Sequence, residues 1–183
     1  HGIAGGVFMW KIGGAKAALG GNLDEVIETA QKVVDNTRSI CVGLEPCAIP
    51  AVGHPNFQIA DGDMEVGIGH HGEPGINVQK LKPAKDIARD MAKAVIDDLE
   101  PESGDEVAVL LSGLGATPIM ELYVLYDDIE AYLKEQGLSI YRVFVGDYVT
   151  SLDMNGAALT VMKLDDELKE LLDYEAKSPG IEI

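Results

Sequence analysis

The sequence has too few cysteines, and no long enough apolar run, for several specialised classes of protein. Only Cys41 and Cys47 occur among 183 residues, which is too few for a disulfide scaffold or a zinc cluster. No apolar run approaches the roughly 18 residues of a membrane-spanning helix, and no basic and apolar leader opens the chain. We therefore expect two free thiols, no membrane and a cytoplasmic location.

Basic residues are also scarce. Lys and Arg number 14 against 31 Asp and Glu, which gives a net charge of −17 and a pI near 4.4. Such a surface repels nucleic acid and anionic lipid, so we expect neither as a partner. Apolar residues make up 46% and charged residues 25% of the chain, the proportions of a folded globular protein. The length fits one domain, or one domain with a piece of another. Because His1 is not an initiator, we expect that something upstream was removed or not recorded.

Hydrophobic periodicity predicts an α/β fold with a mixed β-sheet covered by helices. The expected helices are 7–19, 22–38, 84–99, 117–136 and 165–173. The expected strands are 39–44, 64–69, 106–112, 140–145 and 158–164. No repeat, linker or internal domain boundary is visible.

Capping residues mark two of these helices. Asn22 and Glu25 have the spacing of a reciprocal capping box, and Thr117 before Pro118 predicts a capping hydroxyl ahead of a first-turn proline. The expected apolar stripe of the first of these helices is Leu23, Val26, Ile27, Ala30, Val33 and Val34. The expected buried face of the other is Ile119, Leu122, Tyr126, Ile129 and Leu133.

Residues 67–75 form the segment with the most side chains that could take part in catalysis or ligand binding. Four glycines and a proline surround His70, His71 and Glu73, so the backbone can fold tightly around a small ligand. A neutral imidazole is a nucleophile and a base, and Glu73 can fix its tautomer. A Pro-Gly turn with two solvent-facing histidines explains the same residues. A metal site at His70, His71 and Glu73 is a weaker alternative, because adjacent side chains point to opposite faces, and we assign no metal ligand.

Two further segments offer polar groups between apolar runs. Residues 112–118 form a glycine-rich turn ahead of a helix, where free amides can bind an anion, although a plain strand-to-helix connection fits better. Residues 146–156 bring Thr150, Ser151 and Asp153 together, either for catalysis or in a hydrogen-bonded turn.

At these segments the sequence resembles the K subunit, or DAK1 domain, of dihydroxyacetone kinases. The similarity spans essentially all 183 residues in the family's order. The residues that carry it are Met64-Glu65-Val66-Gly67-Ile68-Gly69, His71-Gly72-Glu73-Pro74-Gly75-Ile76, Leu114-Gly115-Ala116-Thr117-Pro118 and Thr150-Ser151-Leu152-Asp153-Met154.

The resemblance implies that His71 binds a small ketose, dihydroxyacetone, covalently as a hemiaminal, with Gly69, Gly72 and Glu73 around the substrate. It implies a homodimer without a cofactor of its own, and a partner L subunit that carries ATP or ADP with Mg²⁺. It further implies that residues 1–183 are the C-terminal part of a two-domain subunit. The family's N-terminal part also contacts the ketose, so without it we expect these residues alone to phosphorylate nothing.

Two other functions remain open. A K-like protein can bind the ketose without phosphorylating it, as a sensor that contacts a transcription factor. His70 replaces a residue that is commonly aliphatic in the family, which leaves room for another ketose such as erythrulose. In each case adduct formation should weaken below about pH 6.5, where an ordinary imidazole protonates.

Overall fold

The computed structural model describes residues 3–55, 57–69, 71 and 73–183. The helices within these residues are α1 (Gly5–Ala18), α2 (Leu23–Asp35), α3 (Ala84–Leu99), α4 (Ile119–Glu135) and α5 (Asp166–Asp173). The strands are β1 (Thr37–Glu45), β2 (Asp63–Val66), β3 (Asn77–Lys80), β4 (Glu106–Gly113), β5 (Ser139–Gly146), β6 (Asn155–Leu164), β7 (Lys177–Ser178) and β8 (Ile181–Glu182).

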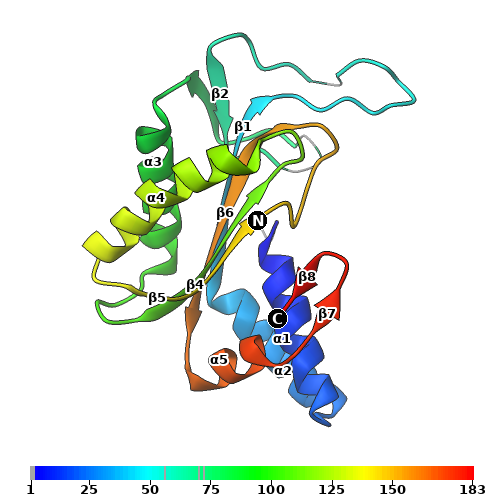
Figure 1. Cartoon of the computed structure of the whole chain (residues 1–183), viewed down its shortest axis with the longest axis vertical. Helices are drawn as coiled ribbons and strands as arrows, with labels where there is room; N and C mark the ends of the chain where they lie inside the picture. The colour runs from blue at the N-terminus through cyan, green and yellow to red at the C-terminus, as the bar shows by residue number, and fades with distance from the viewer. Residues whose placement is uncertain (1–2, 56, 70, 72) are drawn as a thin grey trace.

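Strands β1 to β6 form one mixed sheet in the order β3-β2-β1-β6-β4-β5. The pair β4 and β5 is parallel, and the other neighbours are antiparallel. Helices α3 and α4 lie on one side of this sheet, and α1, α2 and α5 lie on the other (Figure 1). The prediction of a mixed sheet covered by helices is confirmed.

The central strands are apolar on both faces because helices cover both faces. On β4, Val107, Val109 and Leu111 pack with α3 and α4, whereas Ala108 and Leu110 pack with α1 and α5. A third, smaller cluster lies near the N-terminal end of α1, beneath the segments that follow β1, β2 and β4. It consists of Cys41, Cys47, Ile68, Leu114, Met154 and Ala158.

The two cysteines are free thiols, as expected, and both are buried. Burial raises the pKa of the Cys41 thiol to about 12. Its thiolate is therefore scarce at neutral pH, so Cys41 serves as a small apolar core residue.

Local chemistry fixes the start of α2 as predicted. The Asn22 side chain accepts a hydrogen bond from the Glu25 amide at 3.1 Å, and the Glu25 carboxylate accepts one from the Asn22 amide at 2.8 Å. The predicted apolar stripe is wrong for three of its members. Leu23, Ile27 and Val34 are exposed, because no described residue covers that side of the helix.

The prediction for the start of α4 is also wrong. The helix begins at Ile119 with Pro118 as its N-cap. The Thr117 hydroxyl does not cap it, and instead bonds the backbone of Gly156 at the start of β6. Ile119 is exposed, and Leu125 takes the buried place expected of it.

Two strand predictions need correction. Strand β2 ends at Val66 and does not reach residue 69, because Gly67 turns the chain with a φ of +79°. Strand β3 and the β7–β8 hairpin were not expected, since these strands are short and largely polar. The helix expected over 22–38 ends at Asp35, and β1 begins two residues later.

Candidate functional site

The loop that carries His71 connects β2 to β3. It leaves the sheet at Gly67, whose amide donates to the carbonyl of Cys41 on β1 at 2.7 Å. Ile68 then inserts into the small apolar cluster beside Cys41 and Met154. The loop is thus anchored at its base to the sheet and to the core.

Within the loop, the Glu73 carboxylate binds His71 at two points. The Glu73 Oε1 atom lies 3.0 Å from Nδ1 of the His71 ring, and Oε2 accepts the His71 backbone amide at 3.0 Å. The Glu73 carboxylate also accepts its own backbone amide, and these hydrogen bonds to Glu73 and His71 amides and to the ring hold its pKa below the ordinary value. It is therefore ionised at neutral pH.

An ionised carboxylate only accepts hydrogen bonds, so the ring nitrogen facing Glu73 carries the proton. Nδ1–H then donates to Glu73, and the lone pair of the ring is on Nε2. A nucleophilic role of His71 would fall to Nε2 in this tautomer. That Glu73 fixes the tautomer of an imidazole stays a prediction, and the two distances above are the geometry on which it depends.

The absence of a side chain at Gly69 makes the His71–Glu73 arrangement possible. A Cβ atom on Gly69 would lie 2.1 Å from Oε2 and 2.9 Å from Cβ of Glu73. The Gly69 amide also closes the loop by donating to the Glu73 carbonyl at 3.0 Å. Gly69 therefore acts on the site through Glu73, whereas Gly72 and His70 lie outside the described residues.

The site is open to solvent. The side chains of His71 and Glu73 are 72% and 56% exposed. An open imidazole can be reached by a small molecule, but exposure also weakens each electrostatic contact that would hold one. Among the described residues, no cluster of three or more His, Cys, Asp or Glu side chains is placed to hold a metal ion, although His70 is not among those residues.

Several polar groups of the turn at 112–118 have partners within the fold. Its Leu114 amide donates to Gly156, and its Ala116 amide donates to Met154. The Ser112 hydroxyl accepts the amides of Tyr148 and Val149. These groups are used within the fold, which agrees with the plain connection favoured from the sequence.

The segment 146–156 is held against the residues that follow β1. The Asp153 carboxylate accepts the amide of Ala48 at 2.8 Å, and Ser151 is buried with its hydroxyl 3.6 Å from the sulfur of Cys47. These contacts of Asp153 and Ser151 join the segment to residues 47–48, and neither contact is with His71.

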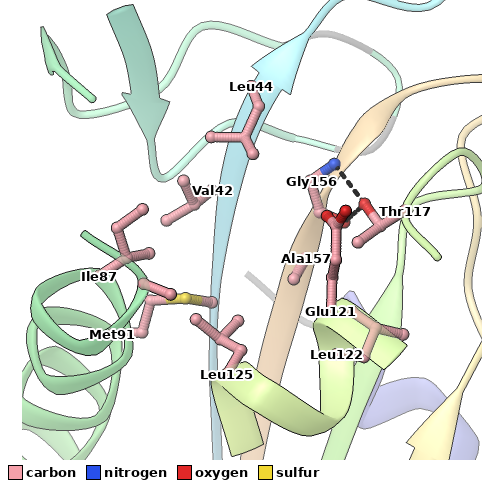
Figure 2. A pocket seen from close by; sticks show the side chains of 11 residues that line it. Val42, Leu44, Ile87, Met91, Thr117, Glu121, Leu122, Leu125, Gly156 and Ala157 are labelled. Carbon is pink, nitrogen blue, oxygen red and sulfur yellow. Dashed lines mark hydrogen bonds between the residues drawn. The ribbon is translucent and has the colours of Figure 1, made fainter. Parts of the chain in front are cut away.

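A separate pocket of about 100 Å³ lies between the N-terminal parts of α3 and α4 and the sheet (Figure 2). Its walls are mostly apolar side chains, and Thr117 and Glu121 are its polar side chains. Sequence patterns did not indicate it, because its walls belong to the core face of four elements. A small polyhydroxylated ligand finds few hydrogen-bonding partners there, so this pocket is not a candidate site for such a ligand. The apolar side chains that line it are those of Val42, Leu44, Ala84, Ile87, Met91, Leu122, Leu125 and Ala157.

Fold and site together define a three-layer α/β domain that presents a carboxylate-oriented imidazole on a glycine-rich loop. Among proteins of this class, the chain belongs to the Dak1 domain family, whose model matches residues 1–180. None of the helices described is both long and apolar enough to cross a bilayer.

Curated relatives include kinase subunits and kinases. The chain is 42% identical over 167 residues to the dihydroxyacetone-binding subunit DhaK of the PTS-dependent dihydroxyacetone kinase 1 of Listeria innocua, and this match covers 91% of the chain and 51% of that subunit. It is 40% identical to the L-erythrulose 1-kinase of Mycolicibacterium smegmatis, with 98% of the chain and 32% of that enzyme covered.

Among solved structures, the dihydroxyacetone kinase operon co-activator Dha-DhaQ superposes with a TM-score of 0.88 at 31% identity. The superposition covers 95% of this chain and 54% of the co-activator. The chain thus spans about half the length of the dihydroxyacetone-binding subunits it matches.

Proposed function

We propose that this chain is the histidine-bearing half of a ketose-binding kinase subunit, with dihydroxyacetone as its substrate and His71 as the covalent anchor. The observation that carries the proposal is the His71–Glu73 pair at 3.0 Å, on a loop whose sequence is that of the Dak1 family. Dihydroxyacetone-binding subunits among the relatives support the substrate.

The covalent step follows from the tautomer. Nε2 of His71 adds to the carbonyl carbon of the ketose, and the π electrons of the carbonyl move to its oxygen. The alkoxide takes up a proton from water, and the Nδ1 proton of the resulting imidazolium returns to water through Glu73, which leaves a neutral hemiaminal and an ionised Glu73. A polyol has no carbonyl to attack, so this bond distinguishes ketoses from glycerol.

Phosphoryl transfer requires more than this chain. The nucleotide and Mg²⁺ are placed on an L subunit or domain, as the family resemblance implies, and the terminal hydroxyl of the anchored ketose attacks the phosphoryl group. Positioning supplies most of the rate in such reactions. The half of the relatives outside the matched region supplies further contacts to the ketose, so residues 1–183 by themselves bind the substrate without phosphorylating it.

Native mass spectrometry and ¹³C NMR test the anchor. With dihydroxyacetone labelled at its carbonyl carbon, we expect a mass increase of one ketose and a carbon signal that moves from the ketone range to that of a saturated carbon. His71→Ala should abolish both signals, whereas His54→Ala, which removes another exposed loop histidine, should keep them. An unchanged adduct in His71→Ala, or none in the parent, would refute the proposal.

Two observations favour alternative functions. Similarity to the co-activator Dha-DhaQ supports a ketose sensor, and similarity to the L-erythrulose 1-kinase supports another ketose. Competition between erythrulose and labelled dihydroxyacetone decides the substrate. A kinase assay with an L subunit decides between sensor and kinase, because a sensor forms the adduct without turnover.

A further inference from the structure

The open edge of strand β1 forms a groove that no described part of the chain fills. Strand β2 pairs with β1 only at Val42 and Gly43, and it turns away at Gly67. The first residues of β1, Thr37 to Ile40, therefore have β6 on one side and no strand on the other. A strand edge of this kind is available for pairing with another segment.

The direction of the backbone groups on this edge follows from the antiparallel pattern. The Cys41 carbonyl accepts from Gly67, so Cys41 faces the β2 side of β1. Backbone groups alternate in direction along a strand, so Ser39 and Thr37 face the same side. The Thr37 carbonyl accepts the Arg38 guanidinium at 2.9 Å. Among the described residues, no backbone group bonds the amide or carbonyl of Ser39.

Apolar side chains border this edge. A groove of about 630 Å³ lies along it, between α1 on one side and Asp98 of α3 on the other. Trp10, the only tryptophan of the chain, lines the groove and is 69% exposed. The other apolar side chains that line it are Ile3, Met9 and Val34.

The groove leads toward the loop that carries His71. A second hollow of about 140 Å³ shares Ile3, Arg38, Ser39 and Asp98 with it and continues to Gly67 and Ile76, the two ends of that loop. A segment bound along β1 would thus end at the base of the loop that carries His71. Arg38 and Asp98, joined by an ion pair of 2.5 Å, border both hollows.

We propose that the β1 edge and this groove receive an extended segment from the half of the Dak1 subunits that lies outside the region matched by residues 1–183, which adds a strand to the sheet at Thr37–Ile40. The inference rests on the proposed function only where it identifies the occupant of the groove as the other half of a ketose-binding subunit. Main-chain hydrogen bonds to Ser39 supply affinity, and alternate apolar side chains fit against Trp10 and Val34. The placement brings that half to the substrate loop.

A second copy of this chain fits the groove less well. Paired strands lie about 4.8 Å apart, and the β1 edge lies between α1 and α3. In two copies facing each other, both edges are recessed in this way, so their helices meet before their strands do. A single extended segment has no such obstruction.

Residue-resolved hydrogen exchange tests the proposal on two proteins: this chain, and the full-length Listeria innocua subunit. The Ser39 amide should exchange fast in this chain, and the aligned amide in the longer subunit should exchange at least about a hundredfold more slowly. The Ile40 amide faces β6 and is the internal control, protected in both. Equal fast exchange at the Ser39 position in both proteins would overturn the proposal, as would protection of Ser39 in this chain that grows with its concentration, which indicates a second copy.

Matched variants test the groove itself. This chain is co-expressed with the part of the Listeria innocua subunit outside its 167 aligned residues. Val34→Asp, in the groove, should reduce co-purification at least tenfold, and Val124→Asp, on the exposed side of α4, should leave it within twofold. The pair is matched because Val34 and Val124 are 48% and 55% exposed. Trp10→Ala and Met120→Ala form a second pair in case an aspartate disturbs a helix.

Equal co-purification with the groove variants and their controls would overturn the proposal. The ketose adduct at His71 is measured separately. The proposal for the groove can therefore be refuted while covalent binding at His71 is confirmed, and the reverse outcome is equally observable. Trp10 emission provides a third readout, since it should shift to shorter wavelength only when the groove is filled.

Discussion

Replacing Gly69 by alanine is the sharpest test of how the loop orients His71. The added Cβ atom would lie 2.1 Å from Oε2 of Glu73, whereas ordinary contacts begin at 3.4 Å. The carboxylate must therefore withdraw by about 1.3 Å, the difference between these distances. Its hydrogen bonds to the ring and amide of His71, both 3.0 Å now, would lengthen beyond the range of about 3.2 Å in which such bonds are effective.

The expected result is a loss of ketose binding without a loss of fold. Gly69→Ala should weaken adduct formation about tenfold, the effect of one well-placed hydrogen bond on an equilibrium. Glu73→Gln should have a similar effect, because an amide has a single acceptor oxygen and cannot accept both the ring Nδ1–H and the backbone amide of His71. The double variant should then be no worse than either single one, since residues that act through one contact are not additive.

The assay is titration with carbonyl-labelled dihydroxyacetone, followed by ¹³C NMR. Gly14→Ala is the control, because a Cβ atom on that helical glycine meets nothing within 4 Å. It should leave the adduct unchanged and raise the melting temperature by about 2–4 °C, since alanine favours a helix over glycine by about 1 kcal/mol. A Gly69→Ala protein that binds ketose like the parent, while Glu73→Gln does not, would refute the reasoning.

Three further predictions concern stability. Met91→Ala empties a fully buried site beside the pocket of Figure 2 and should cost about 2–5 kcal/mol, seen as a melting temperature lower by about 5–15 °C; a drop under about 2 °C would contradict it. Thr117→Val leaves the Gly156 amide without its partner at 2.8 Å and should cost about 1–3 kcal/mol in chemical denaturation, whereas Thr117→Ser should restore stability. Hydrogen bonds from Lys32 and Lys16 lower the pKa of Glu167. The stabilising effect of these ion pairs is therefore present above the ordinary pKa of 4.5, and it is lost as the pH falls through the lower pKa that Glu167 has in the folded protein. Melting temperatures of the parent should therefore fall more steeply between about pH 5 and about pH 3 than those of Glu167→Gln, and parallel curves would count against the ion pairs.

Local sequence signals predicted the elements whose determinants are local. The Asn22–Glu25 capping box fixes the start of α2, and the repeat of Ile87, Met91 and Val95 fixes the buried face of α3. These features depend on neighbours within a few residues along the chain. They are visible in the sequence for that reason.

Features that depend on distant segments were not predictable in this way. The periodicity of α2 identifies an apolar side but cannot say what covers it, and Leu23 and Val34 are exposed in the structure. The Thr117 hydroxyl could bond either to the first amides of α4 or to Gly156 at the start of β6. In the structure it bonds to Gly156, which is distant in the sequence. Strand β3 is short and polar, so its pairing with β2 alone defines it.

In the candidate site, too, contacts between neighbouring residues were predictable and contacts between distant segments were not. His71 and Glu73 are two residues apart, so their contact followed from spacing and chemistry. The close approach of Gly69 to Glu73 and the groove along β1 depend on the folded backbone. Sequence patterns gave no sign of the groove, because its borders come from α1, β1 and α3.

The order of strands in the sheet has a consequence for how the chain folds. Strand β6 lies between β1 and β4 and joins them, with Thr37 opposite Met162 and Glu106 opposite Leu164. It is also the last of the six strands to leave the ribosome. Until then β3-β2-β1 and β4-β5 cannot be joined into one sheet, and β1 and β4 have no strand on the side that β6 will occupy. Contacts over such sequence distances slow folding and leave apolar edges exposed in the meantime, so this interval during synthesis is when aggregation competes most with folding.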